Sequence, residues 1–252
     1  MYRSVNVCLS ISDWFAGFKD DFYLNFIKDE RYMYIFKGLG TTLLITLFAV
    51  LLGIVLGVIA AIIRTTHDKT IDDIRPGFGK FILKFLNSIV NIYLTVIRGT
   101  PVVVQLMITY YVIFASSNNP MLVAVLAFGI NSGAYVAEII RSGIMSIDNG
   151  QFEAGRSLGL NYVQTLIYII VPQAFKNVLP ALANEFIVLV KETSISGYVG
   201  IMDLTRGGDV IRSRTFSAFL PLIAVALIYL VIVVFFTKLV SILERRLRNS
   251  ER

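Results

Sequence analysis

The sequence of 252 residues has little of what most enzymes and soluble domains require. It has one cysteine, Cys8, which excludes an intrachain disulfide, and one histidine, His67, which argues against a zinc cluster within the chain. Charged residues make up only 16%, where about 25% is usual in soluble domains. No Walker A sequence is present, because the segment GFGK at 77–80 lacks both the loop length and the Ser or Thr that should follow. We therefore expect neither a metal site nor ATP hydrolysis on this chain.

Apolar residues, in contrast, are abundant. They make up 56% of the chain, which indicates an integral membrane protein. The net charge of +6 comes from basic residues that flank apolar runs, as positive-inside topology requires, so we do not expect a nucleic acid partner. The apolar run at 5–11 is broken by polar residues and lacks a cleavage site, so insertion is expected to rely on the first spanning helix.

The apolar runs predict an all-α protein with five transmembrane helices, at about 39–63, 98–115, 121–140, 181–202 and 215–240. Residues 1–37 are predicted to form an N-terminal interfacial segment, 38–243 the transmembrane domain, and 244–252 a cytoplasmic tail. Residues 79–96 carry two lysines and two asparagines in one stripe, which predicts an amphipathic helix that leads into the second span.

Basic residues set the predicted orientation. Loops 64–80 and 141–180 and the arginine-rich C-terminus are expected in the cytoplasm, and loop 115–119, without lysine or arginine, outside. Arg206, Arg212 and Arg214 count against this orientation. The loop at 202–214 that carries them is predicted to be irregular.

Residues 148–172 predict a short helix, a turn and a second short helix outside the bilayer. Asp148 is a good N-cap with Gln151 in the capping-box position, and Gly159 is expected to stop the first helix. Asn161, with a glutamine three residues later, can cap the second helix. Pro172 is expected to end that helix at the residue before it, after about 15 Å, which is half the hydrocarbon core.

The same stretch resembles the EAA loop of bacterial ABC importer permeases. The family pattern is Glu-Ala-Ala, three residues, Gly, nine residues, Ile, any residue, Leu and Pro. Here Glu153, Ala154, Gly159 and Pro172 match, while Gly155 replaces the second alanine and a valine replaces the leucine. The resemblance implies that these residues couple the permease to its ATPase.

Other segments resemble polar amino acid permeases. They are RGTPVVVQL at 98–106, AYVAEIIRSGI at 134–144 and NEFIVLVKETS at 184–194. The resemblance covers about 38–242 and implies a type I permease subunit of the bacterial inner or plasma membrane that imports a polar or cationic amino acid by alternating access. The implied partners are a second permease subunit (a copy or a paralogue), two ATPase subunits that hold ATP and Mg²⁺, and an extracytoplasmic solute-binding protein.

The fourth predicted span contains charges that a hydropathy scan would reject. Asn184, Glu185, Lys191 and Glu192 recur at seven-residue steps, which predicts one polar helix face, and ionisable groups inside a membrane usually face a cavity or a partner. The predicted substrate path consists of Gln105, Thr109, Asn131, Ser132, Lys191, Glu192, Thr193 and Ser194.

Several alternatives stay open from the residues alone. Lys191 and Glu192 could equally form structural pairs, and Glu138 beside Arg141 is interpreted as a boundary ion pair. The solute could be another small polar molecule. A secondary transporter, which should show paired internal repeats, and a membrane scaffold or channel are the other classes that fit a multi-span chain.

Overall fold

The computed structural model describes residues 11–249, with the side chains of 17–247. The predictions that concern Cys8 and the last three residues lie outside this part. The described chain forms α1 (Ile11–Phe22), α2 (Tyr32–Thr70), α3 (Phe78–Gly99), α4 (Val102–Ile108), α5 (Pro120–Met145), α6 (Asn149–Ser157), α7 (Tyr162–Thr165), α8 (Val171–Glu192), α9 (Leu204–Thr215) and α10 (Phe219–Asn249). Three π-helical turns, η1 (Tyr23–Ile27), η3 (Thr109–Ile113) and η4 (Leu166–Ile170), and two 3₁₀ segments, η2 (Lys28–Glu30) and η5 (Thr193–Val199), lie between them.

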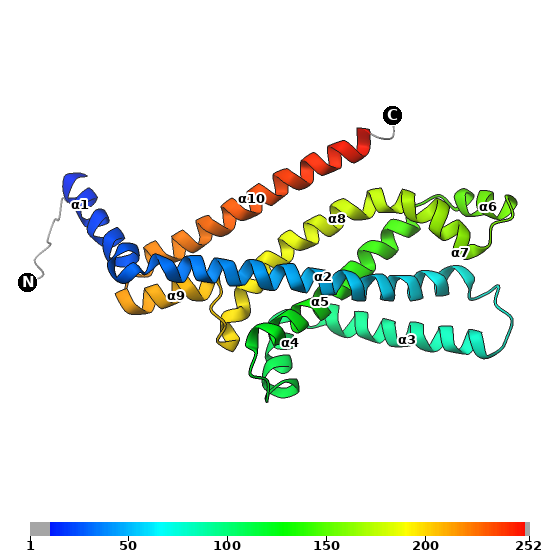
Figure 1. Ribbon diagram of the computed structural model, residues 1–252, viewed down its shortest axis with the longest axis horizontal. Coiled ribbons are helices and arrows are strands. Elements are labelled where there is room, and N and C mark those ends of the chain that lie inside the picture. Colours follow the sequence, from blue (N-terminus) through cyan, green and yellow to red (C-terminus); the bar gives the residue numbers. More distant parts are fainter. Residues whose placement is uncertain (1–10, 250–252) are drawn as a thin grey trace, which may run out of the picture.

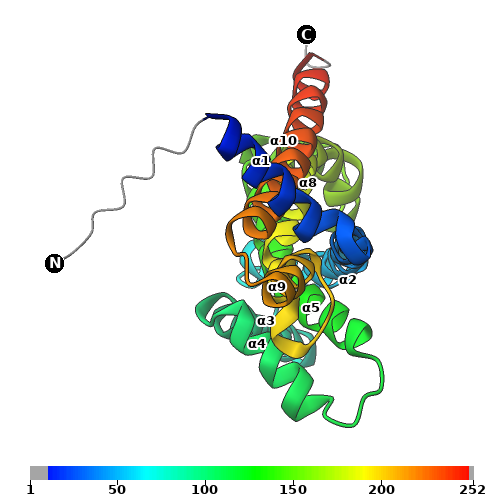
Figure 2. The same cartoon turned by 90° about the vertical axis from the view of Figure 1, so that its left-hand side faces the viewer.

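The long helices run roughly along the long axis of the molecule (Figure 1). Five helical stretches in the described part are long and apolar enough to cross a membrane: Tyr32–Thr70, Phe78–Gly99, Pro120–Met145, Tyr162–Val199 and Phe219–Leu247. The predicted class, an all-α protein with five candidate spans, is therefore confirmed. The α2–α3 connection, α6 and α7 lie at one end (Figure 1), while α1 and α9 lie at the other, which faces the viewer in Figure 2.

The second span lies earlier in the chain than predicted. α3, predicted to be an amphipathic lead-in, is the candidate span, and the predicted span at 98–115 is interrupted. Thr100 has extended backbone angles because the following Pro101 disfavours the α conformation, and only a shorter apolar helix, 102–113, follows. The lysines of α3 are confined to its first two turns, where Lys80 donates to the carbonyl of Ile74 at 3.1 Å.

The prediction that Pro172 ends a helix was also wrong. The preceding Val171 keeps helical angles, and the chain stays helical from Tyr162 through α7, η4 and α8. In η4 the Val171 N–H bonds the carbonyl of Leu166, five residues back, so the helix is wider just before the proline. The wider turn accommodates the proline ring, and the fourth candidate span therefore begins at Tyr162 instead of residue 181.

The segment predicted as a loop at 202–214 is helix α9. The Asp203 side chain caps its start by accepting from the Arg206 N–H at 2.6 Å, and Phe216, with a φ of 54°, ends it in a left-handed conformation. The final candidate span consequently begins at Phe219, four residues later than predicted.

The contact between α2 and α5 holds the centre of the bundle together. It is a seam of small residues in which the two backbones approach closely, and this is how helices associate in lipid, where the hydrophobic effect is weak. A Cβ on Gly53 would lie 2.9 Å from Ser132 Oγ, and one on Gly57 would lie 2.9 Å from the backbone nitrogen of Ala137. Glycine at these positions therefore sets the distance between α2 and α5.

At the α9 end, α9 packs directly on the backbone of α2. The Leu204 N–H donates to Thr42 Oγ1 at 3.1 Å, and a Cβ on Gly207 would lie 2.9 Å from the carbonyl carbon of Tyr34. Asp203 is fully buried here and also accepts from the Gly197 N–H at 2.9 Å. Burial outweighs these hydrogen bonds and raises the pKa of Asp203 from 3.8 to about 6.

We expect Gly57→Ala to destabilise the protein by about 1–3 kcal/mol, because the added methyl overpacks the α2–α5 seam. Gly40→Ala is the matched control, since Gly40 lies in the same helix and a methyl added there would meet nothing within 4 Å. Thermal unfolding of the two variants in detergent measures the difference. Equal melting temperatures would contradict the importance of the seam.

We expect part of the stability to fall as the pH rises from about 4 to about 6. The folded state holds the Asp203 proton more tightly than the unfolded chain does, so protonation favours folding by up to about 3 kcal/mol below pH 4, and this gain is lost above pH 6. Asp203→Asn lacks this contribution. The melting temperature of the wild type minus that of the variant should therefore fall as the pH rises from about 4 to about 6, and a constant value would refute the assignment.

Candidate functional site

Residues 148–172, called the elbow below, form a capped helix–turn–helix at one end of the bundle (Figure 1). Asp148 Oδ1 accepts from the Gly150 N–H at 2.6 Å at the start of α6. At its end Gly159 adopts a φ of 80°, and the Leu160 N–H reaches the carbonyl of Gly155 at 3.1 Å. The predicted cap and stop are thus confirmed, and the bonds form a Schellman motif.

The second half of the elbow also begins as predicted. Asn161 and Gln164 exchange side-chain to backbone hydrogen bonds, each 2.9 Å long, and so form a complete capping box. The predicted capping box at Gln151 does not form, because its side chain accepts from Gln173 Nε2 at 3.2 Å instead. This bond holds the first helix of the elbow against the start of α8.

The two halves of the elbow are in direct contact. A Cβ on Gly155 would lie 2.8 Å from Thr165 Oγ1 and 3.1 Å from Ile169 Cδ1, so α6 rests on α7 and η4 through bare backbone. Beside this contact, the Phe152 and Tyr162 rings stack with their centroids 6.4 Å apart. The elbow is therefore one packed unit.

The elbow is also tied to the C-terminal end of α2 by a lysine. Lys69 Nζ donates to Asn149 Oδ1 at 2.7 Å and lies 4.8 Å from the centroid of the Phe152 ring, which is a cation–π contact. Arg156 reaches Asp73 in the α2–α3 connection at 3.3 Å, an exposed pair of little energetic weight. A displacement of α6 is therefore transmitted to α2 as well as to α8.

The outward surface of the elbow remains open. Glu153 and Ala154 are exposed, and no ion pair of Glu153 is found within residues 17–247. Leu158, at the tip, is 78% exposed within the described part of the chain, so its side chain is available to a partner. Of the predicted coupling residues, Glu153 and Ala154 are thus exposed, with Glu153 at the edge of a pocket between α6 and the end of α2, whereas Gly155, Gly159 and Pro172 shape the elbow itself.

Half of the predicted substrate path lies inside the bundle, bonded to its own helices. Asn131 Nδ2 donates to Gln105 Oε1 at 2.9 Å, and Gln105 Nε2 in turn donates to the carbonyl of Ile97 at 2.7 Å. Thr109 Oγ1 donates to the carbonyl of Gln105 at 2.7 Å. In a single chain these groups connect α3, α4 and α5 and do not line an open passage.

Ser132 belongs to a second buried contact. Its hydroxyl donates to Glu185 Oε1 at 2.9 Å, which joins α5 to α8. Glu185 was predicted to share a polar face with Asn184 and Lys191, but it is buried whereas the other two are exposed. Of the four residues predicted to share this face, Asn184 and Lys191 are exposed and Glu192 is half-buried, whereas Glu185 lies at the edge that packs against α5.

The remaining predicted path residues cluster where α8 meets η5. Lys191 is exposed, and Glu192 and Ser194 are half-buried. Thr193 is fully buried, where its hydroxyl donates to the carbonyl of Val190 at 2.8 Å and lies 3.3 Å from Thr46 Oγ1. Lys191, Glu192 and Ser194, with the half-buried Gln105 at the other end of the path, are therefore the path residues that a solute could reach in a single chain.

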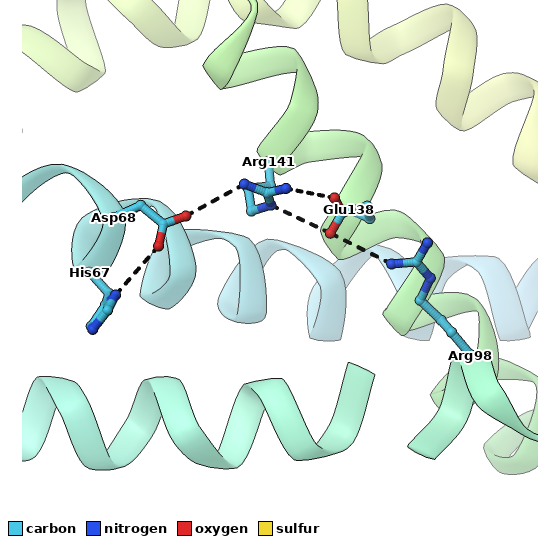
Figure 3. Close-up of polar contacts among 5 residues, drawn as sticks. All are labelled: His67, Asp68, Arg98, Glu138 and Arg141. Atoms are coloured by element: carbon cyan, nitrogen blue, oxygen red, sulfur yellow. Dashed lines mark hydrogen bonds and ion pairs between the residues drawn. The ribbon is translucent and has the colours of Figure 1, made fainter. Parts of the chain in front are cut away.

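A chain of charged groups crosses α2, α3 and α5 nearer the elbow (Figure 3). The expected pair of Glu138 and Arg141 is present at 2.8 Å, but it is part of a larger network. Arg98 approaches Glu138 at 3.7 Å, and Asp68 approaches Arg141 at 3.5 Å. The sequence interpretation missed Arg98 and Asp68, because a charge at the edge of an apolar run looks the same in the sequence whether or not it has a partner.

Comparison with known proteins identifies the family. The model of the binding-protein-dependent transport system inner membrane component matches residues 78–249. The chain belongs to this family. It is thus a permease component of an inner-membrane ABC transport system, and the secondary-transporter and scaffold alternatives lose their support.

Individual relatives agree with this placement. The chain is 40% identical to the glutamine transport system permease protein GlnP of Escherichia coli (strain K12) over 166 residues, which cover 64% of this chain and 76% of the relative. It is also 40% identical to the arginine transport system permease protein ArtQ of Bacillus subtilis (strain 168) over 166 residues, 65% of this chain and 76% of the relative.

Solved structures show the same fold. A crystal structure of an amino acid ABC transporter with histidines matches with a TM-score of 0.76 and 41% identity, over 88% of this chain and 98% of that chain. An inward-facing MetNI methionine ABC transporter matches with a TM-score of 0.71 over 86% of this chain and 97% of that chain; at 19% identity it supports the fold alone.

Proposed function

We propose that this permease imports a polar amino acid, with glutamine and arginine as the first solutes to test, and that separate ATPase subunits drive it through the elbow. The names of the relatives support an amino acid as the solute. The observation that carries the coupling role is the elbow, which is capped at both helix starts, packed on itself and bonded to α2 and α8.

In this proposal the elbow transmits a rigid-body displacement. ATP and Mg²⁺ bind to the partner ATPases, whose closure pushes on the exposed surface of α6. Glu153 offers a carboxylate to a basic side chain of the ATPase, and Leu158 offers an apolar contact at the tip. Because Lys69 and Gln173 hold α6 to α2 and α8, the push moves these spans and alternates access to the solute path.

The proposal also fixes orientation and partners. The elbow end would face the cytoplasm together with the C-terminus, and the α9 end would face an extracytoplasmic solute-binding protein. A second permease subunit, a copy or a paralogue, would cover the exposed side of α8 and complete the path past Lys191, Glu192 and Ser194. The side chains packed behind these residues would then be Thr193, Ser132, Asn131, Gln105 and Thr109.

Copurification tests the assignment as a whole. The chain is expressed with ATPase subunits encoded beside it and reconstituted with the cognate solute-binding protein. We expect a stable complex whose ATPase activity rises when the binding protein carries an amino acid. A chain that purifies without any ATPase subunit would refute the proposal.

We expect Gly159→Val to lower amino acid uptake several-fold while the subunit still inserts into the membrane. A valine at a φ of 80° is strained by about 1–2 kcal/mol, which distorts the turn of the elbow. Gly77→Val is the matched control, because Gly77 also lies in a connection at this end but has an extended backbone with nothing within 4 Å. Uptake per ATP hydrolysed is measured for both, and an unchanged ratio in Gly159→Val would contradict the coupling role.

We expect Glu192→Gln to reduce uptake of arginine more than uptake of glutamine. If the Glu192 carboxylate faces the solute, its loss removes an attraction for a cationic side chain of about 1 kcal/mol or more, which is at least a several-fold change. Competition between the two labelled amino acids in proteoliposomes measures the ratio directly. Equal losses for both solutes would assign Glu192 a structural role.

A further inference from the structure

A polar cavity lies between α2, α3 and α5, close to Gln105 but away from the part of the predicted path at Lys191 and Glu192. Its volume is about 490 Å³, within the range of small-molecule sites. Three arginines contribute to its lining, and we call it the arginine cavity. It is lined by Arg64, Asn91, Leu94, Thr95, Arg98, Gly99, Tyr135, Glu138 and Arg141. Three of the lining residues, Arg98, Glu138 and Arg141, lie next to one another in Figure 3.

The charges around the arginine cavity do not balance. Arg141 is held between Glu138 and Asp68, at 2.8 and 3.5 Å, so its charge is matched on both sides. Three guanidinium groups face two carboxylates, which leaves one positive charge in excess. The excess is shared by Arg98, whose contact with Glu138 is 3.7 Å, and Arg64, which has no ion pair among the described side chains.

Arg64 shows most directly that a partner is missing. Its Nε is buried and has no hydrogen-bond partner within residues 17–247. An unpaired buried donor costs free energy, and for a charged group the cost is larger. A guanidinium presents a planar fork of donors that fits a carboxylate or phosphate with two parallel hydrogen bonds. The rest of the Arg64 guanidinium lines the cavity and has no hydrogen bond or ion pair among the described side chains, so an oxyanion there would satisfy its terminal nitrogens and draw in Arg98.

The position of the cavity separates it from the predicted path at Lys191 and Glu192. The path residue Thr193 contacts Thr46 on α2, whereas Arg64 lies 18 residues further along the same helix. At 1.5 Å per residue the two levels are about 27 Å apart, further than one amino acid can reach. The arginine cavity is thus a second position along the spans, on the side of the elbow.

We propose that the arginine cavity binds the transported amino acid near the end of its path, through its α-carboxylate. Arg64 and Arg98 hold the carboxylate, and the Glu138 carboxylate and the Tyr135 ring, which already lies 5.8 Å from the Arg98 guanidinium, attract the ammonium group. Leu94 is the one aliphatic side chain of the lining, so the cavity offers little to a lipid acyl chain. This inference rests on the proposed transport of an amino acid.

Cysteine protection in the cavity tests the proposal locally. Thr95, an exposed lining residue, is changed to cysteine (Thr95→Cys) in a Cys8→Ser chain, which then carries no other cysteine. The intact complex with its ATPases, in phosphatidylcholine nanodiscs, is labelled with a maleimide, and labelling of this chain is followed over time. We expect L-glutamine or L-arginine to slow labelling about tenfold, and their decarboxylated analogues, 4-aminobutanamide and agmatine, to leave it unchanged.

Two controls separate the site from general effects. Ser88→Cys, exposed on the same helix but outside the cavity lining, should label at the same rate with and without solute. Adding Arg98→Gln to Thr95→Cys should raise the half-protecting amino acid concentration about tenfold, as expected for one lost charge-assisted hydrogen bond. Adding Arg75→Gln, which lies in the α2–α3 connection, should leave that concentration unchanged.

The outcomes that overturn the proposal are distinct. Equal protection by amino acids and their amine analogues would exclude carboxylate recognition, and protection by phosphatidylglycerol nanodiscs without solute would assign the cavity to an anionic lipid. If no amino acid protects while the same complex keeps binding-protein-stimulated ATPase activity, this inference fails and the proposed function stands. Loss of that stimulation by every amino acid in the wild-type complex would instead refute the proposed function.

Discussion

The close approach of α2 and α5 is the constraint on which the rest of the structure depends. In lipid, apolar side chains gain little by leaving their surroundings, so helices associate through close backbone contact and buried polar bonds. Gly53 and Gly57 provide that contact on α2, and Gly133 receives it on α5, where its Cβ position would lie 3.0 Å from Leu56 Cβ. The Ser132–Glu185 hydrogen bond then attaches α8 to the same pair.

Both proposed sites are consequences of this seam. Because α2 and α5 are held backbone to backbone, Arg64 on one helix and Arg141 and Glu138 on the other are brought to the same cavity. Beyond the cavity both helices end at the elbow: α2 ends at Thr70, where the neighbouring Lys69 bonds Asn149, and α5 leads directly into α6. The elbow therefore sits on the ends of the two helices whose spacing is most tightly fixed.

Local chemistry was readable from the sequence, and tertiary consequences were not. The caps at Asp148 and Asn161 and the stop at Gly159 depend on a few neighbouring residues, so they were predicted correctly. The helix continues through Pro172 because the Val171 N–H bonds the carbonyl of Leu166, five residues earlier, and no local rule anticipates this bond. The burial of Glu185 likewise depends on Ser132, 53 residues away, which spacing along one helix cannot reveal.

The unbroken helix through Pro172 has a mechanical consequence. Had the proline interrupted the helix, the elbow would have hung from the fourth span by a hinge, and small displacements would have been absorbed there. With η4 keeping the backbone bonded, the second half of the elbow and Glu185 belong to one continuous helix from Tyr162, about 24 residues or roughly 36 Å in length. A tilt of this helix at the elbow also moves its other half, so a displacement of the elbow becomes a displacement of Glu185 inside the bundle.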